Sequence, residues 1–133
     1  KTTAFGLYQI TDSTKAGLLN NHRDILAGRD FNEPETQKLY VDLLNLEFIE
    51  TLKEKSLPIT NVNLYLTHRF GGPRGVKVVE NIRKPEYKDM LFKDFLLEIG
   101  VSAAGVEEIM AKNDDLPGKT VASILATTTT KLE

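Results

Sequence analysis

Cysteine is absent from this chain of 133 residues, and its only histidines are His22 and His68. The lack of cysteine excludes disulfides and thiolate metal sites, and two histidines do not make a zinc site. We therefore expect neither a metal nor another cofactor. A run of about 18 apolar residues, which a membrane-spanning helix needs, is also lacking, so we expect no membrane span.

Neither sign of charge dominates the sequence. It contains 17 basic and 19 acidic residues, which gives a net charge of -2. This balance gives no support to nucleic acid or an anionic membrane as the main partner. With 41% hydrophobic residues, a chain of this length suits one compact domain around a single core.

Apolar residues recur at helical spacing and no convincing alternating strand is found, so the predicted class is all-α. The longest predicted helix begins at Asn32-Glu33-Pro34-Glu35, where Asn32 is expected to cap and Glu35 to reach back. It is expected to run to about Lys55. Its predicted buried stripe consists of Leu39, Leu43, Leu46, Ile49 and Leu52, and it is widened by Tyr40 and Phe48.

Threonine, glycine and proline mark the limits of further helices. A helix capped by Thr60 is expected to stop at Gly71-Gly72, and Pro73 then opens a partner helix that runs to Ile82. The run from Thr127 to Thr130 is expected to fray, because threonine has a poor helix propensity. Other segments predicted to be helical are 13–19, 103–112, 120–125 and 87–99, the last as one buried helix or two short ones. In all we expect about six or seven helices.

The stretch around Gly6 and Gln9 combines residue types that suit ligand contact. Gly6 lets the backbone approach a ligand closely or adopt a positive φ. Gln9 offers both a donor and an acceptor, as recognition of sugar hydroxyls or acetamido groups requires. On residue types alone, the alternative is a tight turn before a helix that Asp12 or Ser13 caps.

Three segments of the chain resemble one family. Gly6-Leu7-Tyr8-Gln9-Ile10, with Thr14 after it, resembles the G-L-x-Q-I/F-x-x-x-T motif of the lytic transglycosylases, which have a lysozyme-like fold. Residues 64–73, LYLTHRFGGP, resemble the LYLAHFLG-GG segment of phage-type members. Asn113 with residues 116–121 is similar to the N…G-x-x-x-T-V ending of those domains. In order and spacing the resemblance covers nearly the whole chain.

The resemblance implies an activity and a setting. Members of this family cut the β-1,4 bond between N-acetylmuramic acid and N-acetylglucosamine in peptidoglycan, leaving 1,6-anhydromuramyl ends. The implied partners are peptidoglycan glycan strands and other virion proteins. The implied location is the virion of a bacteriophage, or the bacterial periplasm and cell wall.

The resemblance also implies substrate-binding residues. Gln9 is expected nearest the bound sugar, with Tyr8 beside it. Tyr65 and His68 fall where cellular members carry A-Y-N-A-G, whose tyrosine and asparagine line the cleft; His68 takes approximately the place of the tyrosine and Arg69 that of the asparagine. Core packing is the alternative for Tyr8, and a structural or exposed position is the alternative for His68.

The family's catalytic acid has no matching position here. It is a glutamate on a helix that precedes the G-L-x-Q-I segment, whereas the first glutamate of this chain is Glu33. We therefore expect residues 1–131 to form a lytic transglycosylase-like domain without its first helix, and no catalytic residue is assigned. Leu132-Glu133 resembles an expression-vector scar.

Two functions from different classes remain open at this stage. The first is an enzyme domain whose acid lies ahead of Lys1. The second is a non-catalytic glycan-binding or structural virion module with the same fold. A glutamate followed by serine upstream of Lys1 would favour the enzyme.

Overall fold

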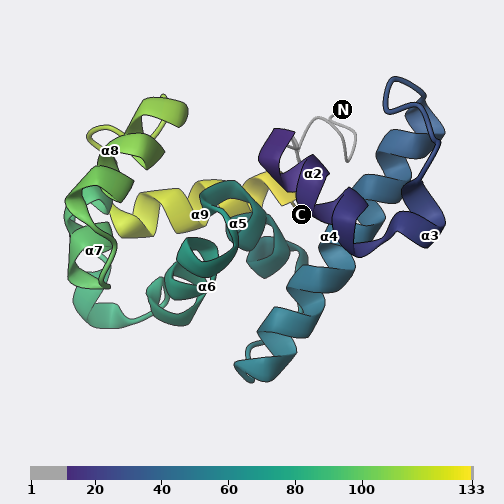
Figure 1. Cartoon of the computed structure of the whole chain (residues 1–133). Helices are drawn as coiled ribbons and strands as arrows, with labels where there is room; N and C mark the ends of the chain where they lie inside the picture. Colours follow the sequence, from purple (N-terminus) through teal and green to yellow (C-terminus); the bar gives the residue numbers. More distant parts are fainter. Residues whose placement is uncertain (1–11, 133) are drawn as a thin grey trace.

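The computed structural model describes residues 12–132. In this part of the chain all regular structure is helical except for an isolated antiparallel bridge between Leu91 and Thr120 (Figure 1). The predicted all-α class is confirmed for this part of the chain. It contains eight α-helices and a 3₁₀ helix. In chain order they are α2 (Asp12–Asn21), α3 (Arg23–Leu26), α4 (Pro34–Glu54), α5 (Asn61–Phe70), α6 (Gly72–Asn81), η1 (Pro85–Tyr87), α7 (Phe92–Glu98), α8 (Ala103–Lys112) and α9 (Val121–Leu132).

The α5–α6 corner forms as the sequence predicts. Thr60 caps α5, because its Oγ1 accepts a hydrogen bond of 3.1 Å from the backbone N–H of Asn63. Gly71 ends α5 with φ +82°, a left-handed backbone that glycine adopts at little cost. Pro73 then lies in the first turn of α6, where its missing N–H is not needed.

The start of α4 differs from the prediction. Glu33, not Asn32, is the N-cap residue, and its side chain makes no capping bond. The backbone N–H of Asn32 donates to Oδ1 of Asp30 at 2.9 Å, so an aspartate turn shifts Asn32 to one residue before the cap. The predicted reciprocal capping by Asn32 and Glu35 was wrong.

The buried face of α4 agrees with the predicted stripe except at Leu46, which is 57% exposed. A buried or half-buried row that includes the predicted Tyr40 and Phe48 recurs at every fourth residue, which is the spacing of one ridge along an α-helix. Its members are Thr36, Tyr40, Leu44, Phe48 and Leu52.

Of the two arrangements predicted for residues 87–99, one helix or two short ones, the structure has two short ones. Tyr87 belongs to η1, and α7 begins at Phe92. The chain between them turns and reaches an isolated bridge to Thr120 at Leu91. There the N–H of Phe92 donates to the carbonyl of Lys119 at 2.8 Å, and the N–H of Val121 donates to that of Met90 at 2.9 Å. This pairing with a distant segment is invisible in local periodicity.

The end of α9 does not fray, contrary to the prediction. The helix continues through the threonine run to Leu132. Thr128 is buried, and its hydroxyl donates to the carbonyl of Ile124 at 2.8 Å; the hydroxyl of Thr129 donates to Leu125 at 2.9 Å. Tertiary burial therefore outweighs the poor propensity of threonine.

Two hydrophobic clusters organise the fold. The larger cluster includes residues from each α-helix from α5 through α9. In it, the ring centroid of Phe92 lies 5.3 Å from that of Phe70 and 5.4 Å from that of Phe95. The smaller lies among α2, α3 and α4, around Leu18 and Tyr40. Figure 1 shows α4 passing from the second group of helices towards α5 and α6. No helix within residues 12–132 is both long and apolar enough to cross a bilayer.

Candidate functional site

A groove of about 1210 Å³ is lined by residues from both hydrophobic clusters, including Leu18 and Leu44 from one and Phe70 and Ile109 from the other. Its walls come from α2, α4, the α5–α6 corner, α8 with the loop after it, and α9. This volume exceeds the roughly 300–1,000 Å³ of sites for drug-sized ligands, so the groove has room for an oligomeric ligand.

Tyr65 and His68 lie one helical turn apart on α5, and both line the groove. The Oη of Tyr65 lies 3.4 Å from Nζ of Lys131 on α9. The ring of His68 packs edge-on against Phe48 of α4, with 6.0 Å between the ring centroids. The structure thus brings these two predicted residues together on one groove wall, and their contact with substrate stays a prediction.

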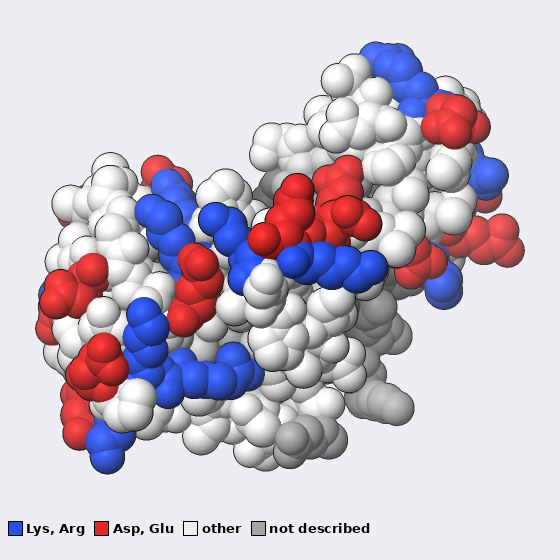
Figure 2. Space-filling model, turned by 90° about the horizontal axis from the view of Figure 1, so that it is seen from below, with Lys and Arg blue, Asp and Glu red and all other residues white. Residues whose placement is uncertain are grey.

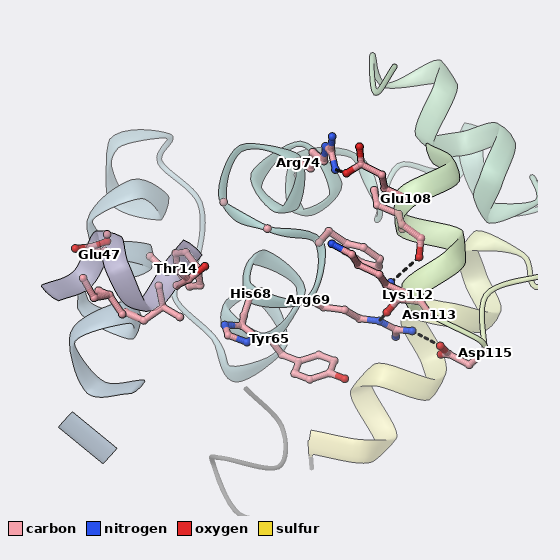
Figure 3. Close-up of a pocket in the computed structure, with 18 of the residues that line it drawn as sticks. Thr14, Glu47, Tyr65, His68, Arg69, Arg74, Glu108, Lys112, Asn113 and Asp115 are labelled. Carbon is pink, nitrogen blue, oxygen red and sulfur yellow. Dashed lines mark hydrogen bonds and ion pairs between the residues drawn. The ribbon is translucent and has the colours of Figure 1, made fainter. Parts of the chain in front are cut away.

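The other two predicted binding residues, Tyr8 and Gln9, lie outside the described residues 12–132, so their placement stays a prediction. Thr14, which follows them in the family motif, is half-buried on α2 and lines the groove. In Figure 3, Thr14 and Glu47 lie on one side and Tyr65 and His68 in the middle. The charged residues of α6, α8 and the following loop lie on the other side.

Arg69 organises that far side. Its Nε donates to Oδ1 of Asn113 at 2.9 Å, and its Nη2 pairs with the carboxylate of Asp115. Asn113 in turn donates from Nδ2 to the carbonyl of Ile109 at 2.7 Å. With only 12% of its side chain exposed, Arg69 fixes the loop after α8 against α5.

Asp115 has a shifted pKa because of this contact. Burial raises the pKa of its carboxyl, but the hydrogen bond and positive charge of Arg69, with a smaller contribution from Lys131, outweigh burial and hold the pKa below its usual range. Asp115 is therefore ionised at neutral pH, which suits it to accept hydrogen bonds rather than to donate a proton.

Glu47 brings a second carboxylate to the groove. Its Oε2 lies 3.0 Å from Nε2 of His22, which is 26% exposed and ties α4 to the start of α3. The sequence analysis did not identify Glu47. The position of Glu47 beside Phe48, on the edge of the buried row of α4, is the signal that would have found it.

The end of the groove near α6 and α8 carries another charged pair. Nη1 of Arg74 lies 3.4 Å from Oε2 of Glu108, and Lys112 lies one turn further along α8. On the face shown in Figure 2, acidic and basic side chains are interleaved without one sign prevailing. This mixture does not suit a nucleic-acid backbone, which selects for a continuous basic stripe.

Among the described residues 12–132, no group of three histidine, aspartate or glutamate side chains is placed to hold a metal ion, so no metal centre is found in the groove. Its lining offers aromatic rings, amides, a hydroxyl and ion-paired carboxylates, which suit a polar oligomer rich in hydroxyl and amide groups. No protein-family model, curated protein or solved structure matches the chain.

Proposed function

We propose that the groove binds the glycan strands of peptidoglycan, in a domain of the lytic transglycosylase type with a lysozyme-like fold. One observation carries the proposal. The three sequence segments that resemble this family contribute Thr14, the Tyr65–Arg69 turn of α5, and Asn113 to the same groove, although they lie far apart in the chain.

The physical character of the groove supports a glycan ligand. Sugars present hydroxyl and acetamido groups, which need donors and acceptors held at fixed positions, together with flat apolar faces that pack on aromatic rings. Tyr65 lines the groove although only 7% of the residue is exposed, while Asn113 and Arg69 are already held by each other. Side chains ordered before binding lose less conformational entropy when the ligand arrives.

Cleavage requires a proton donor for the glycosidic oxygen. The proposed reaction follows the family resemblance: a glutamate ahead of Gly6 protonates the leaving oxygen as the bond to the muramic C1 breaks. The acetamido group stabilises the positive C1, and the C6 hydroxyl then attacks it while returning its proton to the glutamate. The product is a 1,6-anhydromuramyl end, and water is not consumed.

The alternative is a glycan-binding module without activity. The pairing of Glu47 with His22, of Glu108 with Arg74 and of Asp115 with Arg69 favours it for the described groove. Each of these carboxylates has a partner side chain that holds it in place, so each is placed to accept hydrogen bonds from a ligand. In either version the partner is peptidoglycan, and the protein acts on a virion or in the periplasm and cell wall.

The test uses intact mass and N-terminal sequencing of the protein, followed by digestion of purified peptidoglycan sacculi and mass spectrometry of the muropeptides. The enzyme predicts fragments lighter by one water than hydrolysis products, and Gln9→Ala should lower their yield without lowering the Tm. The binding module predicts co-sedimentation with sacculi and no fragments. Neither cleavage nor co-sedimentation would contradict the proposal.

A further inference from the structure

A second hollow of about 610 Å³ lies beside α9, away from the groove. It is enclosed by the segment that follows α6, including η1, and by one face of α9. Its lining residues are Ile82, Arg83, Lys84, Pro85, Lys88, Ala122, Leu125, Ala126, Thr129 and Thr130.

Helix α9 separates this hollow from the groove. Thr127 and Lys131 of α9 line the groove, whereas Ala122, Ala126 and Thr129 line the hollow. At about 3.6 residues per turn, these two sets lie on roughly opposite sides of the helix. A ligand in the hollow therefore does not compete with a ligand in the groove.

The hollow has an apolar floor and a rim on which all charged side chains are positive. Ile82 and Leu125 lie in the floor, and every charged residue of the lining is basic: Arg83, Lys84 and Lys88. Each of the three is exposed. The ion pairs found within residues 12–132 do not include Lys84 or Lys88.

The rim is also fixed in part by the fold. Nη1 of Arg83 donates to Oδ1 of Asn63 at 2.9 Å, so this cation is anchored to α5. The carbonyl of Lys88 accepts from the N–H of Ala122 at 3.0 Å, which fixes the backbone of the rim to α9. An apolar hollow bordered by positive charge favours a ligand with matching shape and opposite charge.

We propose that this hollow is a docking site for an acidic, amphipathic peptide segment of a partner protein. The partner would place one or two apolar side chains on the Ile82 and Leu125 floor and its carboxylates against Lys84 and Lys88. A membrane surface fits less well, because recognition of anionic lipid typically uses clusters of roughly 4–8 basic residues on a projecting surface. The small side chains of Ala122 and Ala126 leave the space that the apolar anchor fills.

The test measures fluorescence anisotropy of a labelled synthetic peptide that has leucine at i, i+4 positions and glutamate elsewhere, titrated with the full chain. We expect binding by the wild type and weakening of about tenfold or more for the Lys84→Glu/Lys88→Glu variant, because like charges then face each other. Lys93→Glu on α7, outside the hollow, changes the net charge as a control and should bind as the wild type does.

Further measurements locate the peptide. Ala126→Trp, which fills the hollow, should abolish peptide binding and leave binding to sacculi unchanged, with circular dichroism confirming that the variant folds. Equal binding by the Lys84→Glu/Lys88→Glu variant, equal binding of a peptide with lysine in place of glutamate, or no binding would overturn the proposal. Tighter binding to phosphatidylglycerol vesicles than to the peptide would overturn it in favour of lipid.

Discussion

Nε of Arg69 donates a hydrogen bond of 2.9 Å to Oδ1 of Asn113, 44 residues further along the chain. This contact joins two of the segments in which the sequence resembles lytic transglycosylases, a resemblance that by itself says nothing of their distance in space. It also aligns the guanidinium with the carboxylate of Asp115. The wall of the groove opposite α2 and α4 therefore depends on one arginine.

Arg69→Ala is expected to destabilise the fold by about 1–2 kcal/mol, because it removes the bond to Asn113 and leaves Oδ1 of that amide without its donor. Urea unfolding measures the change. The matched control is Lys38→Ala, which removes an exposed i, i+4 ion pair with Asp42 and should change stability by less than about 0.5 kcal/mol. Equal losses for the two variants would show that the Arg69 contacts contribute no more than a surface pair.

Gly75→Ala is expected to destabilise the α5–α6 pair by about 1–3 kcal/mol, as overpacking does. An added Cβ would lie 2.4 Å from the carbonyl oxygen of Thr67, and a backbone atom cannot move aside cheaply. Gly17→Ala on α2 is the control, because a Cβ there meets nothing within 4 Å among residues 12–132 and alanine favours a helix. The Tm should fall for the first variant and hold or rise for the second, and a fall in neither would refute the close packing.

Asp115 makes stability depend on pH in acid. Its pKa is lower in the folded state than in the unfolded state, where an aspartate has a pKa of about 3.9. The unfolded state therefore binds the proton first, and the stabilisation is complete above the unfolded pKa and is lost as the pH falls through the folded pKa. Asp115→Asn should flatten the decline in unfolding free energy below about pH 5.

The control for that prediction is the same substitution in the Arg69→Ala background. Because Arg69 causes the lowering, Asp115→Asn should then have little further effect on the pH dependence. An undiminished effect would show that another group controls the carboxyl.

Tyr65→Phe is expected to weaken binding of a peptidoglycan tetrasaccharide by about twofold to tenfold with little change in Tm, because it removes a hydroxyl and keeps the ring. Isothermal titration calorimetry measures the affinity. Tyr87→Phe is the matched control, since Tyr87 packs on Phe95 at 5.4 Å between ring centroids and does not line the groove. Unchanged affinity in Tyr65→Phe would remove that hydroxyl from the predicted binding residues.

The α5–α6 corner was predictable because its signals are local. The Thr60 cap and Gly71 with its positive φ act within one turn of the chain. Predictions failed where a competing contact lay outside the pattern. Asp30 takes the backbone N–H of Asn32, and burial of Thr128 holds a helix end that propensity alone would let fray.

The candidate binding residues could be predicted only from the family resemblance, and their contact with a ligand stays a prediction. The resemblance pointed to Tyr65 and His68, which line the groove, but gave no sign of the Arg69–Asn113 contact or of Asp115 as its second partner. Such contacts depend on how α8 packs against α5, and neither periodicity nor capping signals specify that. Glu47 escaped notice because a glutamate on a long helix looks like any solvated charge.

The most direct test of the central claim is titration of the ¹⁵N-labelled chain with a tetrasaccharide of alternating N-acetylglucosamine and N-acetylmuramic acid, followed by amide chemical shifts. Glycan binding in the groove predicts shifts for Tyr65, His68, Arg69 and Asn113, and none for Lys93 on the surface of α7. Absent shifts, or shifts confined to residues outside the groove, would contradict the claim.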